Sequence, residues 1–405
     1  MNAFSTTQFA GLSTEQLNVL ETSDWAALAT KQIGAMSTSQ LVALGTEDIK
    51  ALGTSQIAAF TSQQLRALST EQVAAFETAD IAVLSSKQIA GFDADRMTAL
   101  STEGVAALSS AVVPLLTTAQ LAALSTNDLR AFTTAQVAVL TTQQLLSLDD
   151  DIGAFETADL AVLGTKQLAA LTSSQIIALG TAGIEALLPA QIAGLSTAQL
   201  NALSQGQLGT LAAADVVLLS TAQIASLGSD DLKELSTDAL ASLTAGQISK
   251  LSDAQIDGFT SREIVALTPR QVASLTTSQI IGLTTAQIDA LQTDDLAGLG
   301  TVQIRALLTS HIDALTTADI ASFTSTQLAA FTSAQLQALG TNDIVALSAT
   351  QLGGLSSIQI PSLTTAQIAA IETADLASLT TRQVVAFTTD QIQALDTRSV
   401  VSLTT

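Results

Sequence analysis

Apolar residues recur at two fixed positions of an eight-residue repeat that fills almost the whole chain. The consensus reads TTAQIAAL: position five is apolar in every repeat, and position eight is always Leu, Phe, Met or Ile. Polar residues concentrate at positions one to four and at position six. Residues 5–148 hold 18 full repeats and residues 156–403 hold 31, and a repeat of seven residues, Asp149 to Phe155, lies between them. About 50 repeats therefore make up residues 1–405, which we interpret as one continuous repeat array with a register break at 149–155.

The spacing of the apolar positions predicts a helix in each repeat. Positions five and eight stand three apart, which places both on one helical face, whereas a strand would alternate with period two. Position eight is then five residues from the next position five, so a continuous helix would drift off its apolar stripe. We therefore predict an all-α solenoid of very short helices, one per repeat. A β-solenoid is the alternative because Thr is abundant, but the Ala, Leu and Gln content and only 22 Gly argue against strands.

Helix-capping residues allow two registers. Position one is usually Ser or Thr and position four is most often Gln, the pattern of a capping box. Pro189 and Pro269 at position two fit this register, since proline is favoured at the first helical residue. Position two is also rich in Thr and Ser, so it could be the N-cap instead, with Gly45 or Gly340 ending the previous helix. Pro114 and Pro361, both at position six, fit that later start better.

The size of one solenoid coil is indicated only weakly. Asp replaces Gln at position four in some repeats, for example at Asp295, Asp319 and Asp343, which are three repeats apart. If these carboxylates line one edge, a coil holds between three and four repeats. The simpler interpretation is that Asp is only another polar residue favoured in the first turn of a helix.

Composition narrows the classes of function. The chain has 14 Lys and Arg against 36 Asp and Glu, a formal charge of −22, which argues against nucleic acid and anionic membranes as partners. It has no Cys, so disulfides and thiolate metal sites are excluded. No apolar run approaches the roughly 18 residues that span a bilayer, so we expect no membrane insertion. The residues from Met1 to Phe4 lack the start of a cleavable signal peptide.

Candidate chemistry is sparse, and we expect no enzyme. The single His, His311, stands at position four and is interpreted as a substitute for Gln, and Trp25 at position five as a core residue. No phosphate loop, zinc motif or nucleophile elbow is present. Asp149, Asp150 and Asp151 at the register break could bind calcium, although a solvated turn that caps the next helix is the simpler interpretation. We expect no other cofactor.

The ends of the array suggest self-association. Solenoids usually protect their terminal faces with atypical, polar repeats, but here the pattern begins by Phe4 and continues to Leu403. Two complementary apolar ends favour head-to-tail contacts between copies, which build open filaments. The residues expected at these ends are Phe4, Phe9, Leu12, Leu395, Val400 and Leu403.

The repeat resembles tracts in large secreted or surface-attached, adhesin-like proteins of Gram-negative bacteria, as in Thr284–Leu291 (TTAQIDAL) and Thr364–Ile371 (TTAQIAAI). This resemblance implies an extracellular or cell-surface location, export without a cleaved N-terminal signal, and contact with other cell-surface components. Our functional hypothesis is a structural protein that self-assembles into a filament or surface layer. The alternatives are a monomeric spacer or adhesin stalk and, less favoured, binding of ice or a mineral surface by the Thr rows.

Overall fold

The computed structural model describes residues 3–403, and in this span nearly every octapeptide forms one short α-helix of four to six residues. No strand occurs among the described residues, which confirms the helical solenoid over the β-solenoid. Helices this short are far below the roughly 12 residues that an isolated helix needs for marginal stability. Each helix therefore depends on its neighbours in the coil.

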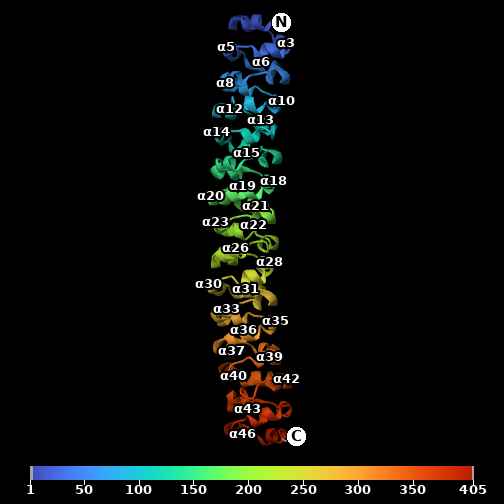
Figure 1. Ribbon diagram of the computed structural model, residues 1–405, viewed down its shortest axis with the longest axis vertical. Coiled ribbons are helices and arrows are strands. Elements are labelled where there is room, and N and C mark those ends of the chain that lie inside the picture. Colours follow the sequence, from blue (N-terminus) through green and yellow to red (C-terminus); the bar gives the residue numbers. More distant parts are fainter. Residues whose placement is uncertain (1–2, 404–405) are drawn as a thin grey trace. The chain divides into compact units, whose positions relative to one another are not determined.

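Two compact units make up the chain, residues 1–207 and residues 208–405, and each is a solenoid (Figure 1). In the first unit the helices are α1 (Thr6–Ala10), α2 (Thr14–Leu17), α3 (Thr22–Ala26), α4 (Thr30–Gly34), α5 (Thr38–Val42), α6 (Thr46–Ala51), α7 (Thr54–Ile57), α8 (Ser62–Ala67), α9 (Thr70–Ala74), α10 (Thr78–Ala82), α11 (Ser86–Ile89), α12 (Ala94–Thr98), α13 (Thr102–Ala107), η1 (Val113–Leu115), α14 (Thr118–Ala122), α15 (Thr126–Arg130), α16 (Thr134–Val137), α17 (Thr142–Leu146), η2 (Asp149–Ala154), α18 (Thr157–Ala161), α19 (Thr165–Ala170), α20 (Ser173–Ala178), α21 (Gly180–Glu185), α22 (Pro189–Ala193) and α23 (Thr197–Asn201). The boundary falls in α24 (Gln205–Leu208).

In the second unit the helices are α25 (Ala213–Val216), α26 (Thr221–Ser226), α27 (Ser229–Glu234), α28 (Thr237–Ser242), α29 (Ala245–Ile248), α30 (Asp253–Asp257), α31 (Ser261–Ala266), α32 (Pro269–Val272), α33 (Thr277–Gly282), α34 (Thr285–Asp289), α35 (Thr293–Ala297), α36 (Thr301–Ala306), α37 (Thr309–Ala314), α38 (Thr317–Ser322), α39 (Ser325–Leu328), α40 (Ser333–Ala338), α41 (Thr341–Ala346), α42 (Ala349–Gly353), η3 (Ile360–Ser362), α43 (Thr365–Ala370), α44 (Thr373–Leu376), α45 (Thr381–Val385), α46 (Thr389–Ala394) and α47 (Thr397–Ser402). The η elements are 3₁₀ helices.

The structure selects position one as the N-cap. Ser13 is typical: its hydroxyl accepts from the N–H of Gln16 at 3.2 Å, and its own N–H donates to the Oε1 of Gln16 at 2.9 Å. This reciprocal pair is a capping box. The later register is wrong, because Gly45 and Gly340 are themselves N-caps with extended backbone rather than ends of the preceding helix.

The proline positions follow from this register. Pro189 and Pro269 stand at the first helical residue, where the missing N–H is not needed. Pro114 and Pro361 stand at position six, where a missing N–H removes a hydrogen bond of the α-helical turn. These two repeats accordingly form the 3₁₀ helices η1 and η3.

Stacked coils bury the two apolar positions of the repeat. Away from the ends, position-five residues are almost completely buried and position-eight residues nearly so, as at Ile176 and Leu179. Each helix packs against the helix that lies three repeats further along the chain, for example α3 against α6 and α35 against α38. Hydrogen bonds described below reach back to the fourth preceding repeat. A coil therefore holds between three and four repeats.

The seven-residue repeat keeps its core residues by changing helix type. Asp149–Ala154 forms the 3₁₀ helix η2, which rises further per residue than an α-helix, so fewer residues can cover the same length of coil. Ile152 and Phe155 still point into the core, 0% and 5% exposed. The backbone adjusts at two places: Asp149 has φ of +45°, and Gly180, one coil later, has φ of +69°.

We expect Gly153→Ala to destabilise the first unit strongly. A Cβ at Gly153 would lie 2.2 Å from the backbone oxygen of Ala178 in the neighbouring coil, and overpacking of this kind costs about 1–3 kcal/mol or more. Gly180→Ala should cost roughly 1–2 kcal/mol through its left-handed backbone alone, since nothing lies near its Cβ. The measurement is urea unfolding followed by circular dichroism.

Gly353→Ala is the control for these substitutions. Gly353 is the last residue of α42 and has open space around its Cβ, so alanine should be neutral or stabilising there. Equal losses in all three variants would show that close approach at the register break is not what requires glycine.

Candidate functional site: the glutamine ladder and the end faces

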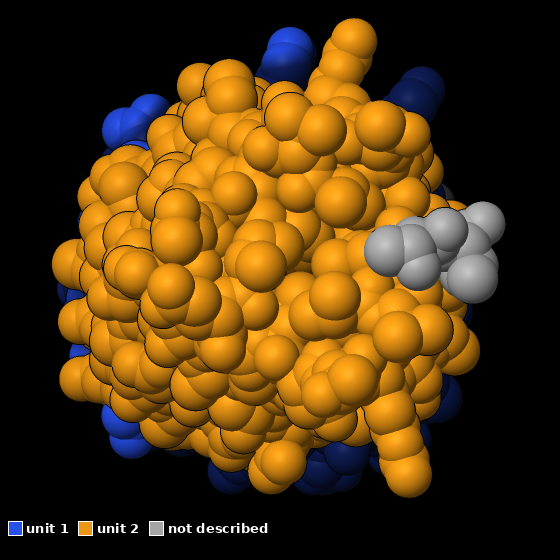
Figure 2. Space-filling model, turned by 90° about the horizontal axis from the view of Figure 1, so that it is seen from below, with its two compact units in different colours: residues 1–207 blue, residues 208–405 orange. Residues whose placement is uncertain are grey.

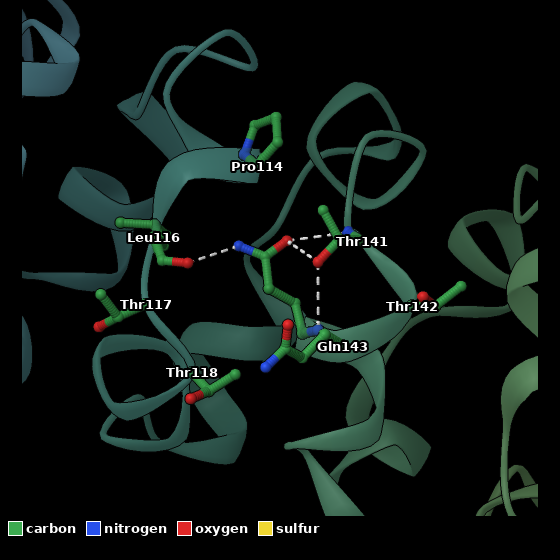
Figure 3. A pocket seen from close by; sticks show the side chains of 8 residues that line it. Pro114, Leu116, Thr117, Thr118, Thr141, Thr142 and Gln143 are labelled. Carbon is green, nitrogen blue, oxygen red and sulfur yellow. Dashed lines mark hydrogen bonds between the residues drawn. The ribbon is translucent and has the colours of Figure 1, made fainter.

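The glutamine at position four joins each coil to the coil before it. Gln144 shows the geometry: its Oε1 accepts from the N–H of Thr141 at 2.8 Å, which completes the capping box of its own helix. Its Nε2 donates to the backbone oxygens of Val113 at 2.8 Å and Leu116 at 2.9 Å, in the fourth preceding repeat. Figure 3 labels the partners Thr141 and Leu116 and marks the hydrogen bonds to them with dashed lines. One side chain therefore closes a helix start and clamps the neighbouring coil.

The same contacts recur along both compact units. Gln64 donates to Ile33 and Met36 at 3.0 and 2.9 Å, and Gln335 donates to Ile304 and Leu307 at 2.8 and 2.7 Å. In each case the acceptors lie 31 and 28 residues earlier, at positions five and eight. We call this series of buried amides the glutamine ladder.

The ladder satisfies carbonyls that the short helices leave without a donor. The position-eight residue follows the helix and its N–H donates back to position five, as from Leu116 to Val113 at 3.1 Å. Among the described residues, the Leu116 carbonyl receives no backbone N–H; its donor is Gln144. A buried carbonyl left without a partner costs about 1–3 kcal/mol, so the ladder is part of what allows such helices to stack.

His311 reproduces the glutamine contacts with an imidazole ring. Its Nδ1 accepts from the N–H of Leu308 at 3.2 Å, and its Nε2 lies 2.9 Å from the Leu283 carbonyl, 28 residues earlier. These partners require the neutral tautomer with its proton on Nε2. The side chain is 1% exposed, and this burial lowers the pKa of His311, while the bond to Leu283 partly opposes the shift.

Aspartate at position four keeps the cap but not the ladder. The Oδ2 of Asp80 accepts from the N–H of Glu77 at 3.1 Å, and that of Asp295 accepts from Gln292 at 2.9 Å. Asp80 and Asp295 are 3% and 1% exposed, and burial raises the pKa of both carboxyls. The simpler interpretation of the Asp positions, as polar residues of the first helical turn, agrees with these contacts.

Removal of one ladder amide should be costly. We expect Gln144→Ala to destabilise the first unit by about 2–4 kcal/mol, because it leaves the Leu116 carbonyl unsatisfied and opens the capping box of α17. Gln143→Ala is the matched control: Gln143 is the adjacent residue but is exposed, so its loss should stay within about 0.5 kcal/mol. Urea unfolding would measure both, and similar losses would contradict the role of the ladder.

The His311 contacts predict a local loss of stability in acid. Because the folded pKa lies below the ordinary 6.5, the neutral ring contributes stability above pH 6.5 that is lost as pH falls through the folded pKa. Protonated Nδ1 can no longer accept from Leu308. His311→Gln should remove this dependence, measured as the difference in urea midpoint between the two chains from pH 8 to 5. Parallel pH profiles would contradict the prediction.

The first coil leaves its amides and its position-eight residues uncovered. Gln8 and Gln16 are exposed, and each amide oxygen accepts from its own N-cap at 2.9 Å. Among the described residues their Nε2 groups have no hydrogen-bond partner. Leu12 and Leu20 are half-buried, whereas the equivalent Leu44 is 4% exposed.

The last coil leaves position-five residues and carbonyls uncovered. Val384 is half-buried, and Ile392 and Val400 are 40% and 41% exposed, although their equivalents inside the solenoid are buried. The Leu379 and Phe387 carbonyls have no ladder amide in the described structure. Figure 2 looks onto this end of residues 208–405. A cleft of about 280 Å³ in the last coil is lined by Leu379, Val384 and Leu403 among others.

The structure divides the predicted end residues into two groups. Phe4 is 41% exposed, as is Val400, and Leu12 and Leu403 are half-buried, so these four remain candidates for a contact surface. Phe9 is fully buried and Leu395 is 9% exposed, because their own coils enclose them, so these two do not belong to that surface.

The sequence did not predict that Gln8, Gln16 and Ile392 lie on the end faces. The number of repeats per coil decides which positions face the next coil, and the sequence indicated that number only weakly. Position-four glutamine was a visible signal, but only its capping role could be inferred from the sequence.

Open clefts lie between successive coils. One of them, about 520 Å³, is lined by Pro114, Leu116, Thr117 and Thr118 on one side and residues 141–144 on the other (Figure 3). A second cleft, near Met36 and Thr61, and another, near Leu243 and Thr268, use the same repeat positions. These clefts are therefore a regular consequence of coil stacking rather than a single specialised pocket.

The three aspartates at the register break begin η2. Asp149, Asp150 and Asp151 are exposed, and the backbone oxygen of Asp149 accepts from the ladder residue Gln175 at 3.2 Å. Within residues 3–403 no group of three or more acidic or histidine side chains is gathered closely enough to hold a metal ion. The three carboxylates therefore do not form a preassembled calcium site.

The fold and the ladder define an α-solenoid built from octapeptides. The ALTTAQ repeat family model matches nine segments that together cover well over half of the chain, at residues 17–49, 41–76, 73–110, 113–150, 152–188, 224–261, 288–325, 337–370 and 368–405. The chain therefore belongs to the ALTTAQ repeat family. A comparison with curated proteins found no match. Every helix between residues 3 and 403 is too short to cross a bilayer.

Proposed function

We propose that this chain is a non-enzymatic structural protein whose copies associate head to tail. The observation that supports the proposal is the complementarity of the two end faces. One presents ladder amides on Gln8 and Gln16 that have no partner among the described residues, and the other presents carbonyls of the kind that ladder glutamines bind inside the solenoid. An extracellular or cell-surface setting, which the sequence resemblance implies, is part of the proposal.

The internal spacing gives the contact a definite register. Each ladder amide binds the fourth preceding repeat, and Gln32 binds the carbonyl of Phe4 at 3.0 Å, so Phe4 holds position eight of the repeat before 5–12. We therefore place the repeat that ends at Phe4 of a second copy directly after repeat 396–403. Gln8 then faces the carbonyls of Val384 and Phe387, and Gln16 faces those of Ile392 and Leu395. The contact would copy the interface between successive coils within one chain.

The chemistry of the two faces also gives the assembly a direction. Donors on one face and acceptors on the other make the contact heterologous, which leads to open polymers unless the geometry closes a ring. The net charge of −22 opposes this association, because every added copy brings like charge close to the last. Association should therefore become stronger as added salt screens the repulsion.

We expect Gln8→Glu with Gln16→Glu to prevent assembly without unfolding the chain. Glutamate keeps an acceptor for each N-cap but replaces both ladder donors with carboxylate oxygens, which repel the partner's carbonyls. Sedimentation velocity over a concentration series, with electron microscopy of the same samples, would show filaments for the unmodified chain and single chains for the variant.

Gln63→Glu with Gln143→Glu is the matched control, since it adds the same charge at exposed positions away from the ends. This variant should assemble like the unmodified chain. Single molecules of the unmodified chain at every concentration and salt level would reject the proposal and favour a monomeric spacer. Repeating the series with calcium and with a chelator would show whether Asp149–Asp151 contribute to assembly.

A further inference from the structure

The buried aspartates create gaps in the glutamine ladder, because their side chains supply no donor to the position-eight carbonyl beneath them; at the Asp295 gap the amide of Gln292 donates only to the neighbouring oxygen of Val265, at 3.4 Å. Asp80 occupies the ladder position above Ile49 and Leu52, and Asp295 the position above Ile264 and Leu267, by the 31- and 28-residue spacings of the ladder. Each carboxylate uses Oδ2 for its N-cap, and its Oδ1 has no hydrogen-bond partner in the described structure. Where glutamine would supply a donor, these gaps combine a carboxylate oxygen with a carbonyl that lacks one.

Within residues 3–403 no cation forms an ion pair with the Asp80 carboxylate. The neighbouring charge that acts on it is Glu77, the N-cap of its own helix, which disfavours ionisation. Helix α10 packs against α7, which carries no charged residue, and against α13, which carries the exposed Glu103. In the repeat that holds Ile49 and Leu52, Lys50 pairs with Glu47 at 2.8 Å, and Asp48 is the remaining charged group.

The surroundings of Asp295 are similar. Asp294 on its own helix is the charge that acts on it, again against ionisation. Helix α35 packs between α32, which carries Arg270, and α38, which carries Asp319. In the repeat that holds Ile264 and Leu267, the charged residues Arg262 and Glu263 approach each other at 3.5 Å.

We propose that these ladder gaps are proton-binding sites that couple the stacking of coils to pH. A proton on the carboxyl group removes the buried charge from among the acceptors and supplies the donor that the gap lacks. The ligand is the proton, and the sites lie at Asp80 in the first compact unit and Asp295 in the second. This inference concerns folding and does not depend on head-to-tail assembly.

The sign of the pH dependence follows from burial. Burial raises the folded pKa of both carboxyls above their ordinary value of 3.8. The stabilisation is therefore fully present below about pH 3.8 and is lost as pH rises through the raised folded pKa. The contribution of these two sites should therefore make the solenoid more stable against urea in mild acid than at neutral pH.

The test is the double variant Asp80→Asn with Asp295→Asn. Asparagine has the shape of the protonated acid, retains an acceptor for the N-cap and adds a permanent donor. Urea midpoints would be measured from pH 3.5 to 8. We expect the variant to unfold at higher urea than the unmodified chain at pH 7, and this difference to shrink towards zero as pH falls to 3.5.

Asp95→Asn with Asp313→Asn is the control, because both side chains are exposed and the change in net charge is identical. It separates the ladder gaps from the general relief of charge repulsion in acid. A constant difference between the double variant and the unmodified chain across the pH range would overturn the proposal. So would an equal pH-dependent gain in the control.

Hydrogen exchange measured by mass spectrometry would give a local readout. Peptides that cover residues 45–60 and 260–275 contain the carbonyls beneath the two gaps. At pH 7 these peptides should exchange more slowly in the variant with Asp80→Asn and Asp295→Asn than in the control variant. Equal protection would again reject the proposal.

Discussion

The structure depends on a donor for the carbonyl that ends each short helix. A helix of four to six residues cannot satisfy its own last carbonyls, and the position-eight carbonyl is placed next to a buried Leu or Phe. In most repeats the donor is one glutamine amide, which comes from the fourth following repeat. Gln144 above Leu116 is representative, with a contact of 2.9 Å. Helix formation and coil stacking are therefore a single event in this fold.

This coupling explains which substitutions the repeat accepts at position four. His311 is compatible because an imidazole has an acceptor and a donor on opposite sides, like the glutamine amide. Asp keeps only the acceptor, so it preserves the helix start and weakens the link to the previous coil. Position four thus adjusts how firmly successive coils adhere, while positions five and eight supply the apolar contact itself.

The same coupling gives every coil a direction. The ladder amides of a coil point towards the preceding coil, and its position-eight carbonyls face the following coil. An uncovered coil therefore has either a face of donors or a face of acceptors. The proposed head-to-tail contact would use contacts of the kind that the solenoid already contains. The dense negative charge and the exposed hydroxyl rows on the sides do not offer a comparable self-complementary surface.

The sequence by itself determined the unit of structure. The three-residue spacing of positions five and eight, with Ser13 and Gln16 as a representative capping pair, specifies a short helix and its buried face through local geometry alone. The sequence did not decide which position is the N-cap, because the repeats with glycine and proline allowed two registers. It did not decide the number of repeats per coil either. Only the tertiary structure showed that Gln8 and Gln16 are unused donors and that Phe9 is enclosed, because both facts depend on which repeats lie above one another. That arrangement is set by contacts between residues about 30 positions apart, and the periodicity of a single repeat contains no information about it.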